Sequence, residues 1–209
     1  MYAYDEDYLY GAKEHFAGMI DYAVKWCGMP LREFYSRFLN SGIPEAMQTG
    51  HPKYLAGMSG IELAIAVVND TGGNLPVDPS YTYPWEDPSY YWTGGVLCHY
   101  QWYKGASFSA IDKGGLPIEK IHSLFNPFHE ADITKFIDVA DSLYRPASIR
   151  ERRKRFGYTQ EQLAEKSGVT LRMIRAYEQG TQDIARAEAA TVIRLAKELC
   201  CTPDCLIKA

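Results

Sequence analysis

Three polar side chains able to contact a nucleic acid occur close together in "SGVTLRMIRAYEQG", residues 167–180. A guanidinium donates hydrogen bonds through a rigid fork, which matches both the acceptor pair on guanine and the oxygens of phosphate. Arg172 and Arg175 are three residues apart, so a helix would present them on neighbouring positions of one face. Thr170 precedes them at the expected amino end, where the helix dipole favours a phosphate. The types and spacing therefore predict a helix whose outward face can bind DNA.

The other face of this helix is expected to pack inside a domain. Apolar residues recur on this face at helical offsets, and two apolar residues of the preceding helix are expected to pack against them. The expected core consists of Leu163 and Ala164 from the preceding helix with Val169, Ile174 and Tyr177. Gly168 allows the tight turn before this helix, because glycine accepts backbone conformations that other residues resist. The pattern predicts two helices joined by a short turn.

Helix starts and stops surround the turn on both sides. Capping boxes are predicted at Ser148 with Glu151 and at Thr159 with Gln162. Later, "AEAATVIRLAKEL" (187–199) predicts an amphipathic helix, and Pro203 after Thr202 predicts a last short one. The inward face expected for the helix in 187–199 contains Ala190, Ile193, Ala196 and either Leu199 or Cys200.

The stretch "GYTQEQLAEKSGVTLRMIRAYEQG" (157–180) resembles the helix-turn-helix of the Cro/repressor family, often called XRE-like, and the resemblance extends over residues 148–207. It implies a five-helix domain whose third helix enters the major groove, usually as a two-fold dimer. By position, Gln160 matches a phosphate-anchoring glutamine, and Arg153 with Glu178 matches a partly buried ion pair. The groove-facing positions of the family correspond to Thr170, Leu171, Arg172, Arg175 and Ala176.

Charge divides the chain into two regions. Residues 1–147 contain 18 acidic and 10 basic side chains, a formal net charge of −8, whereas residues 148–209 contain 8 and 12, a net charge of +4. All four tryptophans and 14 of the 16 tyrosines lie in the first region. Because Pro146 disfavours helix for the residue before it, we expect a domain boundary between residues 147 and 148.

The first region is also predicted to be helical, so the expected fold class is all-α. Its longest patterned segment, residues 8–26, places apolar side chains on one face, and Ser59 with Glu62 forms a third capping box. Residues 71–89 predict a long Pro- and Gly-containing loop. The face expected in residues 8–26 consists of Leu9, Phe16, Met19, Ile20, Ala23 and Val24.

An aromatic group begins within this loop and continues beyond it, and it suits a core, a ligand pocket or a subunit interface alike. Residues 1–147 as a whole resemble an uncharacterised region found ahead of such DNA-binding domains in bacterial regulators. The aromatic group comprises Tyr81, Tyr83, Trp85, Tyr90, Tyr91, Trp92, Tyr100, Trp102 and Tyr103.

No stretch of the sequence has the residue spacing of the catalytic or metal-binding motifs that we compared with it. "GMSGI" (57–61) lacks the last glycine of a nucleophile elbow, and Ser59 is explained as a helix cap. "HEAD" (129–132) lacks the second histidine of a zinc motif, and "CCTPDC" (200–205) lacks a C-x2-C pair. We therefore expect no enzyme activity, no cofactor and no metal. The five scattered cysteines and the absence of a long apolar run predict a cytoplasmic protein that does not bind membranes.

Together these patterns predict a cytoplasmic, sequence-specific DNA-binding transcriptional regulator, a repressor, that binds double-stranded DNA as a homodimer. Residues 1–147 would serve dimerisation, sensing of a small ligand or binding of a protein partner. An alternative of another class is an antitoxin, in which residues 1–147 bind a toxin and residues 148–209 repress the shared operon.

Overall fold

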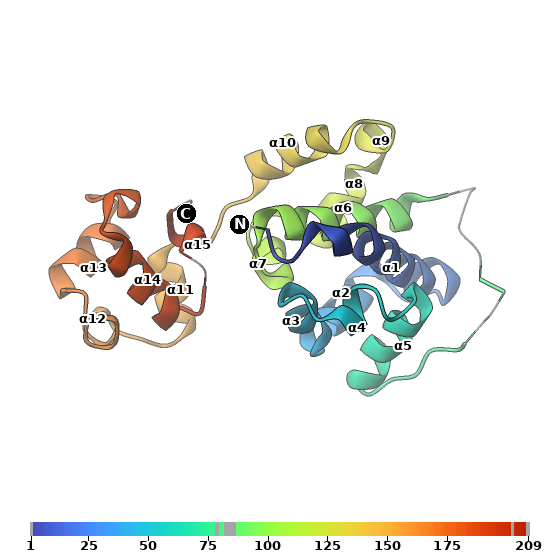
Figure 1. Ribbon diagram of the computed structural model, residues 1–209, viewed down its shortest axis with the longest axis horizontal. Helices are drawn as coiled ribbons and strands as arrows, with labels where there is room; N and C mark the ends of the chain where they lie inside the picture. The colour runs from blue at the N-terminus through green and yellow to red at the C-terminus, as the bar shows by residue number, and fades with distance from the viewer. Residues whose placement is uncertain (1, 78–79, 82–86, 202, 208–209) are drawn as a thin grey trace. The chain divides into compact units, whose positions relative to one another are not determined.

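The computed structural model describes residues 2–77, 80–81, 87–201 and 203–207. The chain forms two compact units, Met1–Tyr144 (unit 1) and Arg145–Ala209 (unit 2). The division therefore falls three residues before the boundary expected at residue 147. Every regular element that the described residues form is a helix, which confirms the all-α prediction (Figure 1).

Unit 1 contains the helices expected from the capping and apolar patterns, together with short ones that those patterns did not predict. The helix over 8–26 is interrupted, because α1 continues into a π-helical turn, η2. Four short α-helices, α3, α4, α7 and α9, were not predicted. The elements are η1 Glu6–Tyr8, α1 Leu9–Asp21, η2 Tyr22–Trp26, α2 Leu31–Asn40, α3 Ile43–Gln48, α4 Pro52–Leu55, α5 Gly60–Asp70, α6 Ser89–Lys104, α7 Phe108–Lys113, α8 Ile118–Ser123, α9 Phe125–Phe128 and α10 Ile133–Leu143.

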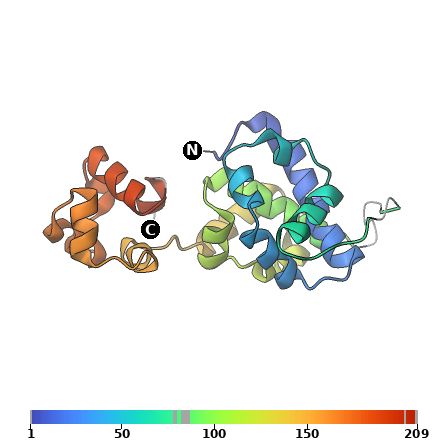
Figure 2. The ribbon, with the colours of Figure 1, turned by 90° about the horizontal axis from the view of Figure 1, so that it is seen from below.

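Helix α1 lies at the centre of unit 1 and packs mainly against α6 and α5 (Figures 1 and 2). Small residues permit both close crossings. A Cβ atom on Gly94 of α6 would lie 2.8 Å from the Ala17 Cα of α1, and one on Gly60 of α5 would lie 2.6 Å from the Gly18 carbonyl carbon. Gly60, inside the "GMSGI" motif, is thus explained by helix packing.

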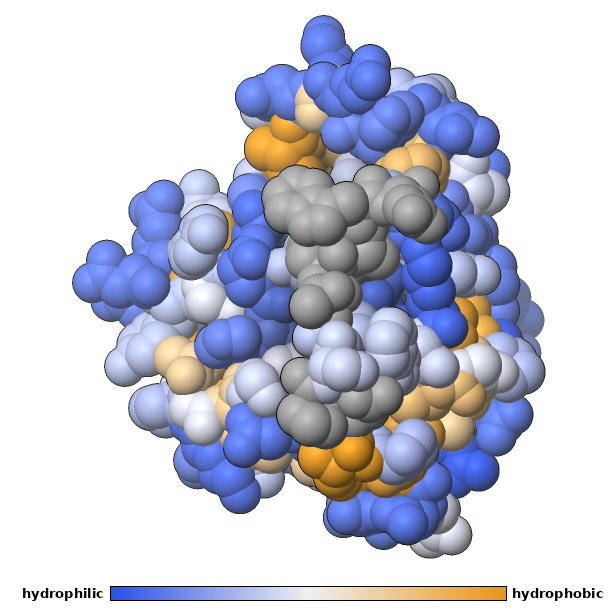
Figure 3. All heavy atoms as spheres, turned by 90° about the vertical axis from the view of Figure 1, so that its right-hand side faces the viewer, coloured by the Kyte–Doolittle hydropathy of each residue, from blue (hydrophilic) through white to orange (hydrophobic). Residues whose placement is uncertain are grey.

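The apolar face predicted for residues 8–26 is buried as expected, with relative exposures of 0 to 9 %. The aromatic group has mixed placements. Tyr100 and Trp102 are buried, and Tyr81 donates a 2.7 Å hydrogen bond to the buried Asp21 carboxylate. Tyr83 and Trp85 lie outside the described residues. On the side shown in Figure 3, the visible surface is mostly hydrophilic and is interrupted by separate apolar patches.

Unit 2 has the five α-helices that the family resemblance implies, and a 3-10 turn joins the third to the fourth. Both predicted capping boxes are present, at Ser148 with Glu151 and at Thr159 with Gln162. Leu163, Val169 and Ile174 are buried, with Ala164 and Tyr177 packed against them, as predicted. The elements are α11 Ile149–Arg155, α12 Gln160–Ser167, α13 Leu171–Glu178, η3 Ile184–Arg186, α14 Ala189–Glu198 and α15 Asp204–Ile207. The predicted cap Thr202 lies outside the described residues.

The inward face predicted for α14 is wrong in its first turn. Ile193 is 56 % exposed and Ala190 is also exposed, whereas Val192 and Leu195 are buried beside Ala196. The buried residues Val192, Leu195, Ala196 and Leu199 follow the i, i+3, i+4, i+7 spacing of one helical face, and this face meets the core. Spacing alone did not distinguish two apolar stripes that are one residue apart.

Within the described residues, no helix has the length and apolar character needed to cross a bilayer. The same residues bring together no group of three or more His, Cys, Asp or Glu side chains suited to a metal ion.

Candidate nucleic-acid interface

Two short helices, α12 and α13, are joined by a tight turn that aims α13 outward. Gly168 ends α12 in the left-handed conformation (φ 65°), where a residue with a Cβ atom would be strained. Thr170 then begins α13, and its hydroxyl oxygen accepts a 3.4 Å hydrogen bond from the Met173 backbone N–H. The hydroxyl hydrogen of Thr170 remains available to donate to another group.

Five of the six residues predicted to contact DNA line one concave surface, which we call the α13 surface. Gln160, the sixth, lies outside it, at the start of α12. Motif matching missed Gln179, Thr181 and Gln182, which extend this surface beyond α13. The residues that line it are Thr170, Leu171, Arg172, Met173, Arg175, Ala176, Gln179, Thr181 and Gln182.

The residues beyond α13 join the surface because the chain folds back after Gly180, which has a φ of 70°. The backbone N–H groups of Thr181 and Gln182 donate to the Ala176 carbonyl at 3.0 and 3.3 Å. The only sequence signal for this return was the glycine at the helix end, which predicts a stop without giving the direction of the following chain.

The two arginines of the α13 surface differ in their partners. Arg175 Nη2 lies 3.2 Å from Glu161 Oε1, and both side chains are more than half exposed. Arg172 is exposed and makes no hydrogen bond or ion pair within the part of the chain that the structure describes. The guanidinium of Arg172 can therefore bind a partner without leaving another group.

A buried polar network holds α13 to the two helices before it. Arg153 of α11 donates to Glu178 of α13 through Nε at 2.6 Å and Nη2 at 2.9 Å, and Gln160 Nε2 donates to Glu178 Oε2 at 2.8 Å. Arg153 Nη1 also donates to the Tyr158 carbonyl at 2.7 Å. The Glu178 side chain is only 2 % exposed and that of Arg153 11 %. The network thus fixes the position of α13 from its carboxyl end.

The network keeps Glu178 ionised. Burial by itself raises the pKa of Glu178, but the hydrogen bonds from Arg153 and Gln160 and the charge of Arg153 lower it, and the net pKa lies below the ordinary value. The hydrogen bond to Glu178 in turn raises the pKa of Arg153.

Helix α11 contributes both internal and external cations. Arg152 is buried, and its Nε donates to the Ala147 carbonyl at 3.0 Å, so this side chain serves the structure of unit 2. Arg150, Lys154 and Arg155 are exposed and leave α11 with a positive outer surface.

The order of the helices, the tight turn and the outward α13 are the features of a helix-turn-helix. Residues 149–204 match the helix-turn-helix family model. The match confirms the predicted XRE-like resemblance, and it covers just over a quarter of the chain, all within unit 2. Comparisons with curated proteins and with solved structures gave no match. The helix-turn-helix identifies unit 2 as a DNA-binding segment of the type found in XRE-like regulators.

Proposed function

We propose that the protein is a sequence-specific transcriptional repressor that places α13 of its helix-turn-helix in the major groove. The observation that supports this most strongly is Arg172, an exposed and unpaired guanidinium in the first turn of α13. It lies on a concave surface shared with Thr170 and Arg175. Arg172 would donate two hydrogen bonds to O6 and N7 of one guanine, a contact that discriminates by about 1–3 kcal/mol.

Arg175 would contact the DNA backbone instead of a base. Its exposed salt bridge with Glu161 supports this role, because a guanidinium that already donates to a carboxylate at the start of α12 is less free to donate two hydrogen bonds to one base. Leu171 and Ala176 have no hydrogen-bonding side-chain groups, so they would contact thymine methyl groups or fill space in the groove.

Gln160 and Thr170 would anchor phosphates at the amino ends of the two helices. The amide of Gln160 has two N–H groups, and one of them donates to Glu178. The second N–H is left for a phosphate oxygen, while the bond to Glu178 orients the amide. The same carboxylate would therefore order both the recognition helix and a backbone contact.

The repressor would act as a homodimer on two half-sites, as the two-fold symmetry of this class of DNA-binding domain implies. Unit 1 would provide dimerisation, ligand sensing or binding of a protein partner. Its negative formal charge makes it unsuited to approach phosphate, whereas residues 148–209 have a net charge of +4.

Footprinting of the full-length protein on the DNA upstream of its own coding sequence tests this function. We expect two protected half-sites related by two-fold symmetry, with centres separated by about one helical turn, 10–10.5 base pairs, or a multiple of it. A protein with unit 2 removed should give no protection. Uniform protection of unrelated DNA, or binding by unit 1 alone, would contradict the proposal.

A further inference from the structure

A cavity of about 350 Å³ opens on unit 1, and none of the residues assigned to DNA binding lines it. Residues of α1, α6, α9 and α10 line it, and α6 contacts each of the other three helices (Figure 1). Its volume is near the lower end of the range for small-molecule sites. The aromatic side chains that line it are Tyr91, Trp92, Phe125, Phe128, His129 and Phe136.

Among the described residues, several of the rings that line the cavity pack on one another, and the Phe128 ring does not. Trp92 packs edge-to-face on Phe125 and Phe136, each with its ring centroid 5.6 Å away. Phe128 is half-buried and makes no ring contact with any residue that the structure describes. A flat ligand in the cavity could therefore pack on Phe128 without displacing another ring.

Gly95, which also lines the cavity, is not required by helix packing. A Cβ atom there would have only the Ala17 Cβ within 4 Å, at 3.9 Å, whereas a Cβ on the neighbouring Gly94 would collide with the α1 backbone. Glycine inside a helix is destabilising relative to alanine. Gly95 thus keeps space open at a position where a larger residue could be accommodated.

The polar groups of the cavity leave one cation without a partner. Glu14 is exposed and accepts a 2.7 Å hydrogen bond from the Tyr91 hydroxyl. Lys13 is half-buried and has no hydrogen bond or ion pair among the described residues. Its neighbour His99 stays neutral near pH 7, because burial and then the charge of Lys13 lower the pKa of His99 to about 4.

We propose that this cavity binds a small aromatic carboxylic acid. Its ring would lie against Phe128 and Trp92, and its carboxylate would accept a hydrogen bond from the Lys13 ammonium. The carboxylate follows from the unpaired, half-buried Lys13, and the flat ring follows from the unpaired Phe128 and the space beside Gly95. This site is independent of the proposed DNA-binding function.

Calorimetric titration of the full-length protein, without DNA, tests the proposal with phenylacetate and indole-3-acetate as probes. Phenylacetamide serves as the neutral isostere, and 2-phenylethylamine serves as the cation that Glu14 would select. We expect the acids to bind about tenfold or more tightly than the amide, since a charge-assisted hydrogen bond is lost in the amide. The amine should bind more weakly than the amide.

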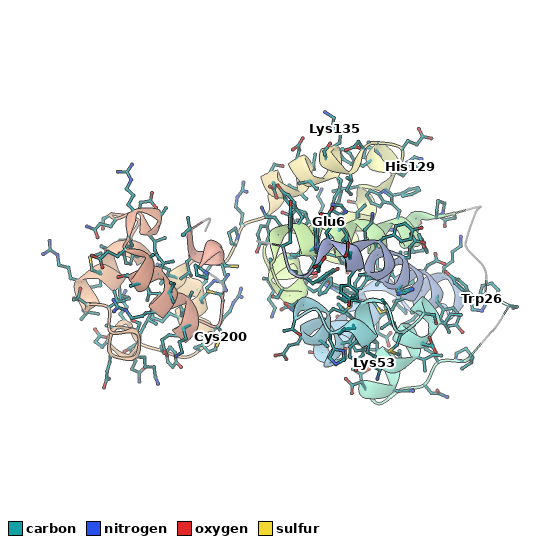
Figure 4. All side chains as sticks on the ribbon, in the orientation of Figure 1. Glu6, Trp26, Lys53, His129, Lys135 and Cys200 are labelled. Atoms are coloured by element: carbon teal, nitrogen blue, oxygen red, sulfur yellow. The ribbon has the colours of Figure 1, made fainter. Side chains whose placement is uncertain are left out.

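Variants separate the roles of charge and space. Lys13→Met should bring the affinity for the acid down to that for the amide. Lys135→Met, which removes an exposed cation of α10 that projects away from unit 1 (Figure 4), should leave both affinities unchanged. Gly95→Leu should abolish binding of both probes. If that variant does not fold, Phe128→Ala should weaken the binding of phenylacetate and of indole-3-acetate by about the same factor.

Four outcomes would overturn the proposal. They are equal affinities for the acid and the amide, tighter binding of the amine than of the acid, no binding of either acid, and an unaltered preference for the acid in Lys13→Met.

Discussion

Replacing Glu178 with glutamine should destabilise unit 2 strongly. The carboxylate is 2 % exposed and accepts two hydrogen bonds from Arg153 and one from Gln160. An amide removes the negative charge and presents an NH2 group to two donors, which leaves the Arg153 guanidinium uncompensated. Loss of one partner of a buried ion pair costs about 3–5 kcal/mol. For a unit of this size, the transition should move down by on the order of 12 °C or more.

The same unit provides a matched control. Arg175 and Glu161 form an ion pair whose side chains are 52 % and 61 % exposed, so Glu161→Gln should leave the melting temperature of unit 2 nearly unchanged. All tryptophans belong to residues 1–147, so fluorescence would not report on unit 2. Calorimetry of the full chain, with hydrogen exchange of α12 and α13 amides, resolves its transition. Equal melting of the two variants would refute the structural role given to the Arg153–Glu178 pair.

Three further outcomes are expected. Folding lowers the pKa of Glu178, so the contribution of this carboxylate to stability should be complete above the ordinary glutamate pKa of about 4.3. That contribution should be lost as the pH falls through the pKa of the folded state. The stability of unit 2 should therefore fall less steeply with acid in Glu178→Gln than in the parental protein. In urea titrations followed by tryptophan fluorescence, Gly94→Ala should destabilise unit 1 by about 1–3 kcal/mol, whereas Gly95→Ala should be neutral or stabilise it by up to about 1 kcal/mol. Operator affinity should fall with salt at a log–log slope of about −0.9 for each phosphate neutralised, and a slope near zero would exclude contacts to phosphate.

Local signals predicted the helices of unit 2 well, because each one starts or stops at a residue with a specific backbone role. Ser148 and Thr159 form capping boxes, and Gly168 has the left-handed conformation expected at a tight turn. In the larger unit 1, the same approach found the long helices and missed α3, α4, α7 and α9. Their four to six residues are too few to show an apolar period.

Tertiary contacts were less accessible from the sequence. The inward face of α14 depends on how this helix packs in the core of unit 2, and the residues after Gly180 join the α13 surface only because the chain folds back. The bond from Gln160 to Glu178 also links residues 18 positions apart. Such contacts depend on how helices pack, which neither composition nor spacing specifies.

The central claim is that α13 recognises bases through Arg172, and a binding selection on randomised half-sites tests it most directly. The parental protein, Arg172→Ala and Arg175→Ala should be selected in parallel at one salt concentration. We expect Arg172→Ala to lose the preference at one base pair in each half-site, and Arg175→Ala to keep the parental preferences with a lower affinity for all sequences. Retention of the full parental preference by Arg172→Ala, with only a uniform loss of affinity, would contradict the claim.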